Sequence, residues 1–166
     1  MTADEIAARN SMLNLATQQF HDRAPNTWAY LDAGNAGWVN SATMASRLSQ
    51  AGVANVRGFS LNVSNLYTTA QSTTYAAAVN SALSANYHYT KQFVVDTSRN
   101  GNGSNGEWCN PAGRKLGTPA QAGTGSNDML LWIKTPGASD GLCGIAPTTP
   151  AGTFTADIAN RLIDGR

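Results

Sequence analysis

Polar side chains follow the apolar segments of this chain at the points where strands are expected to end. Asp32, Asp96 and Lys134 close the segments WAYLD, KQFVVD and MLLWIK, and Asp140 follows shortly after the last of them. Three of the ten acidic residues therefore lie at or just past a strand end. Paired carboxylates can act as general acid and general base, and a nearby lysine can bind hydroxyl groups. The pattern predicts acid–base chemistry, although Asp96 can instead form a structural ion pair with Arg99.

Other kinds of site find little support in the sequence. The only histidines, His21 and His88, lie on a polar helix end and ahead of a strand, and no G-x-S-x-G motif is present. Gly101, Gly103 and Gly106 have the spacing of G-x-G-x-x-G, but the segment that follows contains proline and cannot open the helix that a dinucleotide needs. We therefore expect no catalytic metal and no cofactor.

The four tryptophans divide between loops and strands. Trp38 and Trp108 lie in loop-like sequence, whereas Trp28 and Trp132 lie inside strand-like segments and are expected in the core. An exposed indole offers a flat apolar surface on which a pyranose ring stacks. Glycoside hydrolysis needs two carboxyl groups beside such a sugar site. Trp38 and Trp108 thus indicate a sugar-binding groove.

Hydrophobic periodicity predicts helices that alternate with strands. The expected helices cover residues 3–21, 41–51 (with Ser41 as its N-cap), 69–83 and 155–163. The expected strands cover residues 28–32, 56–62, 91–96 and 129–134. This order predicts an α/β fold of parallel βα units in a single domain over residues 1–166, with its chemistry in the loops after the strands. Two of these loops, residues 97–128 and 135–152, are long and lack predicted regular structure.

The composition predicts a polar but weakly charged surface. The formal net charge is +1 and 13% of the residues are charged, compared with about 25% in a typical soluble domain. We therefore expect neither nucleic acid nor a membrane among the partners. Such a surface suits a neutral ligand rich in hydroxyl groups.

The two cysteines, Cys109 and Cys143, lie in glycine-rich sequence without the neighbouring ligands of a metal site. A disulfide between two loops is the favoured interpretation, and two free thiols are the alternative. A disulfide implies an oxidising compartment. The sequence contains neither a signal peptide nor a long apolar run, so we expect a secreted protein without its export signal.

Five segments of the chain resemble, in order, sequence blocks of glycoside hydrolase family 6, the inverting cellobiohydrolases and endoglucanases that cut β-1,4-glucans. They are YLDAGNAGW (30–38), FSLNVSNLYTT (59–69), FVVDTSRNGNG (93–103), GEWCNPAGRKLGTP (106–119) and LLWIKTPGASDG (130–141). Five blocks in one order make the resemblance specific. It implies a distorted (β/α) barrel, of which this chain forms about half, with a substrate groove over the strand ends.

The resemblance implies roles for individual residues. Asp32 matches a carboxylate beside the cleaved bond, and Asp140 matches the carboxylate proposed as general base, which acts through water. Cys109 and Cys143 match a disulfide of the C-terminal loops. The residues expected to contact a β-1,4-glucan or cello-oligosaccharide are Trp38, Asn62, Arg99, Trp108 and Lys134.

The chain departs from the family pattern in three ways. It resembles only the C-terminal half of the catalytic domain, and no segment matches the half that carries the general-acid aspartate. Ala138 stands where the family has a substrate-binding glutamate, and Asn35 stands where it often has histidine. We predict a β-1,4-glucanase unit of the inverting, two-carboxylate type whose general acid is missing from this chain. The alternative is a non-catalytic glucan-binding or structural half-barrel.

Half of a barrel has an unusual surface. Closing a barrel removes its sheet edges and covers its interior, so an open half exposes edge strands and apolar side chains. We therefore expect the chain to form a homo-oligomer through its exposed sheet edges.

Overall fold

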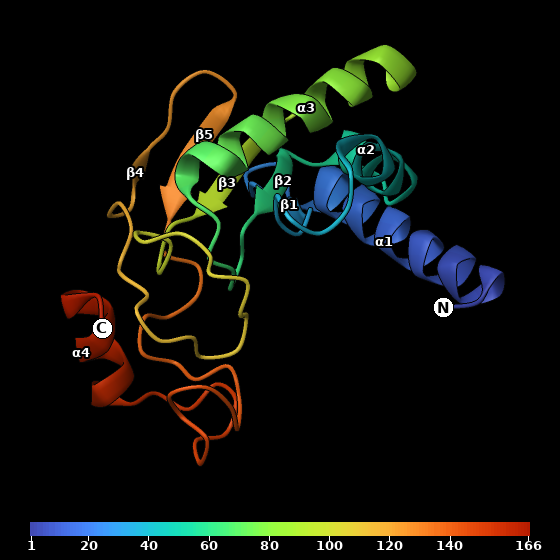
Figure 1. The fold of residues 1–166 in the computed structure, drawn as a ribbon. Helices are drawn as coiled ribbons and strands as arrows, with labels where there is room; N and C mark the ends of the chain where they lie inside the picture. Colours follow the sequence, from blue (N-terminus) through green and yellow to red (C-terminus); the bar gives the residue numbers. More distant parts are fainter.

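The computed structural model, which describes residues 1–166, contains an open five-stranded sheet (Figure 1). Its strands are β1 (Tyr30–Asp32), β2 (Gly58–Leu61), β3 (Gln92–Asp96), β4 (Gln121–Ala122) and β5 (Asn127–Leu131). They lie in the order β1-β2-β3-β5-β4. All neighbours are parallel except β4, which runs antiparallel to β5. The predicted parallel βα units are therefore confirmed.

The chain also forms four α-helices and one short 3₁₀ helix. They are α1 (Ala3–Arg23), α2 (Ser41–Gln50), the 3₁₀ helix η1 (Val53–Asn55), α3 (Thr69–Tyr87) and α4 (Ala156–Asp164). Helices α2 and α3 pack on each other and on the strands (Figure 1). The main core lies between them and the sheet, where Phe59, Val79, Leu83 and Val95 are fully or almost fully buried. This core fixes the strands whose ends carry the candidate site.

Side-chain caps define where the helices begin. Thr2 and Thr68 each form a capping box, with Glu5 and Gln71 respectively, at the starts of α1 and α3. The prediction that Ser41 caps the second helix is wrong by one residue. The side chain of Asn40 accepts the hydrogen bond from the Thr43 amide at 2.8 Å, and Ser41 is the first helical residue.

The strands are shorter than predicted, and this corrects the placement of two tryptophans. Strand β1 begins two residues after Trp28, and β5 ends one residue before Trp132. Neither indole reaches the core, because both lie beyond the paired part of the sheet; the two residues are 57% and 39% exposed. The indole of Trp132 donates to the carbonyl of Thr118, while that of Trp28 packs under the guanidinium of Arg57.

One strand lies in a segment that was predicted to be irregular. Gln121 and Ala122 form β4 and pair with Leu130 and Met129 of β5. A strand of two residues presents few unpaired backbone N–H and C=O groups, so this edge of the sheet can hardly pair with a further strand. The opposite edge, β1, pairs with β2 alone.

A polar cluster of Tyr30, Arg57 and Asp128 connects β1 with β5 across the sheet. The register of β3 with β5 shifts by one residue, so that Asn127 pairs with Phe93 but Met129 pairs with Val94. Asp128 is the extra residue, and such a bulge changes the direction of a side chain. Its carboxylate accepts hydrogen bonds from the hydroxyl of Tyr30 in β1 at 2.7 Å and from two nitrogens of Arg57 at 2.7 and 2.8 Å.

These contacts shift the ionisation of both partners. The hydrogen bond from Arg57 holds the pKa of Asp128 below its usual value, and burial together with the hydrogen bond to Asp128 raises the pKa of Tyr30 to about 12. The stabilisation from Asp128 is present above the pKa that it has in the unfolded chain and is lost as the pH falls. That from Tyr30 is lost as the pH rises from about 10 towards 12.

Replacing Asp128 by Asn is expected to lower the free energy of unfolding by about 1–3 kcal/mol, because it weakens three hydrogen bonds at a side chain that is mostly buried. Urea denaturation measures the change. Asp157→Asn is the matched control: it removes an exposed ion pair with Arg161, a contact that contributes about 0.3–0.5 kcal/mol. Equal stability losses in the two variants would refute the structural role of the cluster.

Helix α1 differs from its predicted packing. A helix was expected over residues 3–21, with its apolar residues on one face, but Met12, Leu15 and Phe20 are exposed and only Thr17 is buried. The helix contacts the molecule mainly through η1 and extends away from the sheet (Figure 1). None of the helices has the length and apolar character needed to cross a membrane.

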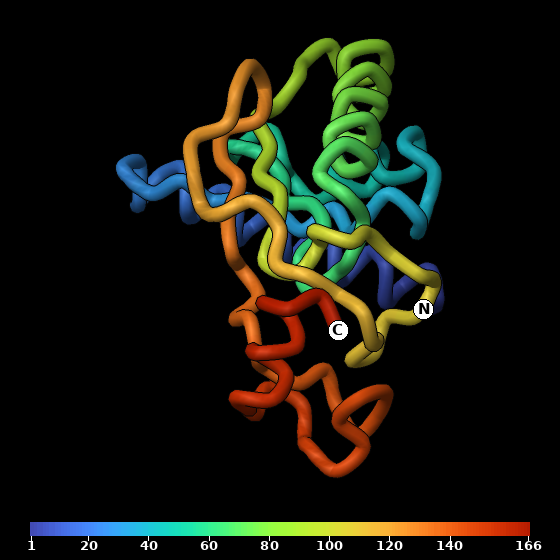
Figure 2. The backbone as a smooth tube through the Cα atoms, turned by 60° about the vertical axis from the view of Figure 1, so that its left-hand side comes forward, coloured from blue at the N-terminus to red at the C-terminus, as the bar shows by residue number.

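The segments after β3 and β5 form a lobe at the C-terminal ends of the strands, together with α4 (Figure 2). A small separate core of Ala146, Ile158 and Leu162, with Leu116 and Ile145 packed against it, holds this lobe together. The lobe carries most of the predicted site residues.

Candidate active site

A tight turn after β5 directs the chain back towards the strand ends. Pro136 and Gly137 are its central residues, Gly137 has a φ of 98°, and the Ala138 amide donates to the Thr135 carbonyl at 3.1 Å. These are the features of a type II turn, in which the third position needs a positive φ and therefore favours glycine. The turn places Asp140 next to the end of the strand that it follows.

Asp140 lies at the centre of a buried ionic cluster. Its Oδ2 accepts hydrogen bonds from Arg99 Nη1 at 2.6 Å and from the Asn110 amide at 2.9 Å, and its Oδ1 accepts one from Lys134 Nζ at 3.0 Å. The side chain of Asp140 is only 7% exposed and that of Arg99 6%. The structure therefore brings together three of the predicted site residues: Arg99, Lys134 and Asp140.

This environment keeps Asp140 ionised. Burial by itself would raise the pKa of its carboxyl group, but the hydrogen bonds from Arg99, Asn110 and Lys134 outweigh burial and hold the pKa below its usual value. Both oxygens are occupied by protein donors. As it stands, Asp140 is a fixed negative charge and a weak base.

Asp96 does not form the ion pair that the sequence suggested. Arg99, three residues away, binds Asp140 and the Ser64 carbonyl instead. The carboxylate of Asp96 is fully buried and accepts four backbone amides, those of Ser64, Ser98, Ile133 and Lys134. It thereby joins the ends of β2, β3 and β5 and holds Lys134 in position.

Asn110 is a site residue that sequence reasoning missed. Its Oδ1 accepts the Asp140 amide at 2.8 Å, and its Nδ2 donates to Ser139 Oγ at 3.0 Å and to the Gly141 carbonyl at 2.8 Å. It is buried and has a φ of 42°, a conformation that asparagine adopts more readily than most residues. Its position directly after Cys109 was the sequence feature that could have identified it as a site residue.

The predicted disulfide is present between Cys109 and Cys143. It joins the two long loops on either side of the Asn110–Asp140 contacts. The bond therefore fixes the loop of Trp108 relative to the loop of Asp140.

Asp32 occupies a different environment from Asp140. It is exposed, and its Oδ1 accepts the amide of Gly34 at 2.8 Å. It lines a cavity of about 220 Å³ together with Trp38. The guanidinium of Arg47 lies 5.4 Å from the centre of the Trp38 ring. Asp32 is thus open to a ligand, unlike the carboxylate of Asp140.

The two loop tryptophans lie around one cavity. Trp38 and Trp108 are 61% and 69% exposed and line a space of about 210 Å³ with Asn35 and Glu107. Trp108, in the wall of this cavity, precedes Asn110 of the ionic cluster by two residues. Indoles, an amide and a carboxylate are the groups that bind pyranose rings and their hydroxyls.

Asn62 was expected to contact the glucan, but the structure buries it inside the protein. Its side chain is fully buried, its Nδ2 donates to the Asp96 carbonyl at 2.9 Å, and its Oδ1 accepts the Tyr67 amide at 3.0 Å. Both ends of the amide are therefore used within the protein, and Asn62 positions the loop after β2.

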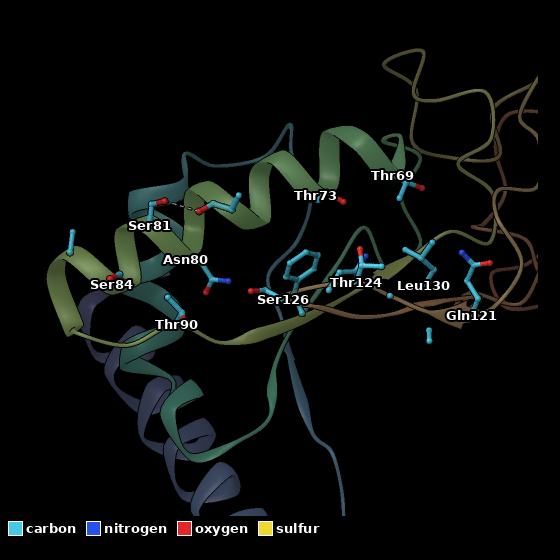
Figure 3. A pocket seen from close by; sticks show the side chains of 16 residues that line it. Thr69, Thr73, Asn80, Ser81, Ser84, Thr90, Gln121, Thr124, Ser126 and Leu130 are labelled. Carbon is cyan, nitrogen blue, oxygen red and sulfur yellow. Dashed lines mark hydrogen bonds between the residues drawn. The ribbon is translucent and has the colours of Figure 1, made fainter.

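The largest cavity lies elsewhere. A groove of about 930 Å³ runs along α3 and beside β5 (Figure 3). Its lining is neutral and includes Thr73, Ser81, Gln121, Thr124 and Ser126. It contains no titratable side chain, so the candidate for acid–base chemistry remains the cluster around Asp140.

Comparison with known proteins agrees with this geometry. The family described as "Glycosyl hydrolases family 6" matches residues 2–166. Endoglucanase 1 of Streptomyces halstedii is 58% identical over 165 residues, which are 99% of this chain and 51% of that protein. Endoglucanase A of Cellulomonas fimi is 49% identical over 132 residues, which are 78% of this chain and 28% of that protein.

A solved structure shows the same architecture. The endoglucanase Cel6 from Mycobacterium tuberculosis, in complex with methyl-cellobiosyl-4-deoxy-4-thio-β-D-cellobioside, matches with a TM-score of 0.90 and 38% identity. The match covers 99% of this chain and 56% of that chain. This confirms the predicted α/β fold as parallel βα units of a partial barrel. The matched residues span between 28% and 56% of the length of the relatives named here.

Proposed function

The chain belongs to glycosyl hydrolase family 6, and on this premise we propose that it supplies part of an active site that hydrolyses β-1,4-glucosidic bonds in cellulose or related β-glucans. The observation that carries the proposal is that one loop connects the ionic cluster with the tryptophan cavity. The buried, ionised Asp140 is bound by the amide of Asn110, and two residues earlier in the same loop Trp108 lines a cavity of about 210 Å³ with Trp38.

The proposed mechanism inverts the anomeric carbon. In such a reaction one carboxyl group protonates the leaving oxygen while a second activates a water molecule on the opposite face of the sugar. We assign the activation of the attacking water molecule to Asp140. Because its oxygens are occupied by Arg99, Lys134 and Asn110, a proton reaches it through an intervening water or after Lys134 moves aside.

Asp32 provides the second carboxylate of the proposed site. Its exposed carboxylate lies beside Trp38, where a negative charge stabilises the oxocarbenium-like transition state. We place the general acid in the part of the family domain that this chain does not span. Trp38, Trp108 and Lys134 hold the glucan, and Arg99 and Asn62 position these groups.

Asp140→Asn is expected to lower the release of reducing ends from soluble β-1,4-glucan by at least about 100-fold, because the variant cannot accept the proton of the attacking water. Asp32→Asn is expected to reduce the rate in the same assay. Asp157→Asn, an exposed change on α4, serves as the control and retains the wild-type rate. The same rate in all four proteins would exclude catalysis at this site.

A glucan-binding protein without hydrolytic activity is the second candidate function. The saturated hydrogen bonding of Asp140 favours it, because a carboxylate held by two cations is a poor base. In this case cello-oligosaccharide binding survives Asp140→Asn and is lost in Trp38→Ala. Titration calorimetry on these two variants separates this function from the hydrolase.

Self-association through the open side of the sheet is a further part of the proposal. Strand β1 has one partner strand, and α1 next to it exposes Met12 and Leu15. Sedimentation velocity is expected to show a dimer whose fraction rises with protein concentration, and Leu15→Lys is expected to lower that fraction. A single monomeric species at all concentrations would contradict the proposal.

We also propose that the protein is secreted. The disulfide between Cys109 and Cys143 supports this, since such bonds persist in oxidising compartments. Glucan polymers are too large to enter a cell intact, so an enzyme that cuts them acts outside.

A further inference from the structure

Trp28 is an exposed aromatic side chain at the opposite end of β1 from the candidate active site. It precedes the strand by two residues, whereas Trp38 follows the strand on the side of Asp140. The sequence predicted a core position for Trp28, but the residue is 57% exposed. Neither the proposed hydrolysis nor the packing of the core explains a large exposed indole here.

The indole of Trp28 is held rigidly in place. The guanidinium of Arg57 covers one of its faces at 4.3 Å from the ring centre. Arg57 is in turn fixed by two hydrogen bonds to Asp128, and Asp128 is fixed by the hydroxyl of Tyr30. Because one face is covered and much of the residue is exposed, the other face is available to a ligand. A rigid surface loses little conformational freedom when it binds.

A cavity borders this surface. It has a volume of about 370 Å³, and its lining includes Phe20, His21, Thr27, Trp28 and Asn55. This volume falls within the range of about 300–1,000 Å³ that is usual for ligand pockets. The lining combines aromatic walls with an imidazole, a hydroxyl, an amide and the guanidinium of Arg57, which can donate hydrogen bonds to hydroxyl groups, and it contains no carboxylate. Such a set suits a neutral ring that carries hydroxyl groups.

The same construction occurs twice in this chain. At the candidate active site, an arginine packs on the exposed Trp38 beside a cavity; at the other end of β1, an arginine packs on the exposed Trp28 beside a cavity. We propose that the Trp28 pocket is a second carbohydrate site, which binds a pyranose unit of a β-glucan by stacking on the indole. The choice of β-glucan rests on the function proposed above, but the site itself is separate from the catalytic groove.

The four tryptophans allow each site to be followed in one experiment. In ¹⁵N-labelled protein, the four indole N–H signals are assigned by single Trp→Phe substitutions and recorded while a thio-linked cello-oligosaccharide is added. The Trp28 signal is expected to shift and saturate with its own dissociation constant. Trp132 is an internal reference, because its N–H already donates to the Thr118 carbonyl.

The outcomes distinguish this inference from the proposed function. If Trp38 and Trp108 shift while Trp28 does not, the second site is refuted and the groove remains. If none of the three shifts, both proposals fail. If the Trp28 signal shifts with protein concentration in the absence of sugar and does not respond to sugar, the surface is a protein interface and the inference is overturned.

A binding assay on insoluble cellulose provides the second test. Trp28→Ala is expected to weaken binding by about fivefold or more through the loss of one aromatic contact. Trp38→Ala is the matched control in the groove, and the indole signals of Trp38 and Trp108 report whether Trp28→Ala still folds. A correctly folded Trp28→Ala protein that binds cellulose as tightly as wild type would overturn the inference.

Discussion

Replacing Arg99 by Met is expected to lower the free energy of unfolding by about 3–5 kcal/mol, the usual cost of breaking a buried ion pair. The substitution removes the shortest contact to Asp140, a 2.6 Å hydrogen bond between two nearly inaccessible side chains. Lys134 and the Asn110 amide remain, but they must then balance the buried carboxylate alone. Chemical denaturation at neutral pH measures the change.

The loss of stability in Arg99→Met is expected to depend on pH. In the wild type the pKa of Asp140 is lowered on folding, so its ionic contacts stabilise the protein above about pH 4 and this contribution is lost as the pH falls further. Arg99→Met removes one of the hydrogen bonds that lower that pKa, so the pKa of Asp140 is expected to rise relative to the wild type. The difference between variant and wild type is therefore largest at neutral pH and shrinks towards pH 3.

Two comparisons check this prediction. Arg161→Met removes an exposed arginine and its contact with Asp157, and is expected to cost well under 1 kcal/mol. The double variant Arg99→Met with Asp140→Asn is expected to lose less stability than the sum of the single changes, because Asp140→Asn removes the negative charge that Arg99 balances. Additive losses would show that Arg99 and Asp140 do not interact.

Removing the disulfide is expected to lower the free energy of unfolding by about 2–5 kcal/mol. Cys109 and Cys143 are separated by 34 positions, and closing a loop of that length in the unfolded chain corresponds to about 4 kcal/mol in the chain-entropy description. The double variant Cys109→Ser with Cys143→Ser, compared with wild type by thermal and urea denaturation, measures the effect.

The disulfide variant should also affect binding. The bond joins the Trp108 loop to the Asp140 loop, so its loss is expected to weaken cello-oligosaccharide binding in the groove without affecting the Trp28 indole signal. Reduction of the wild type with dithiothreitol should reproduce the double variant. A reduced protein with unchanged stability would mean that hydrogen bonds such as those of Asn110 hold the two loops on their own.

Much of the fold followed from local patterns. The apolar runs located four of the five strands, and their alternation with helices required a parallel sheet. The exact residues at which the strands begin and end did not follow from these patterns, because a strand ends where its neighbouring strand no longer pairs with it. This is why Trp28 and Trp132 are exposed rather than buried. Strand β4 escaped notice because two residues are too short to produce a periodic pattern.

The candidate site was predictable in its residues but not in its contacts. Strand ends and loop positions identified Asp32, Lys134, Asp140, Trp38 and Trp108, and the family resemblance added the roles that these residues are expected to have at a glucan. Asn110 was missed because its role depends on a loop about thirty residues away, which no local pattern reveals.

The sequence by itself determined the βα order, the strand ends that precede the site residues and the family. Each depends on interactions between residues that are close in the chain, or on residue identities alone. Only the tertiary structure decided which charges pair. Arg99 lies three residues from Asp96 but binds Asp140, which is 41 positions away, because Asp96 is already saturated by backbone amides from three strand ends. The partners of a buried charge are set by which loops meet around it, and that is a property of the folded chain.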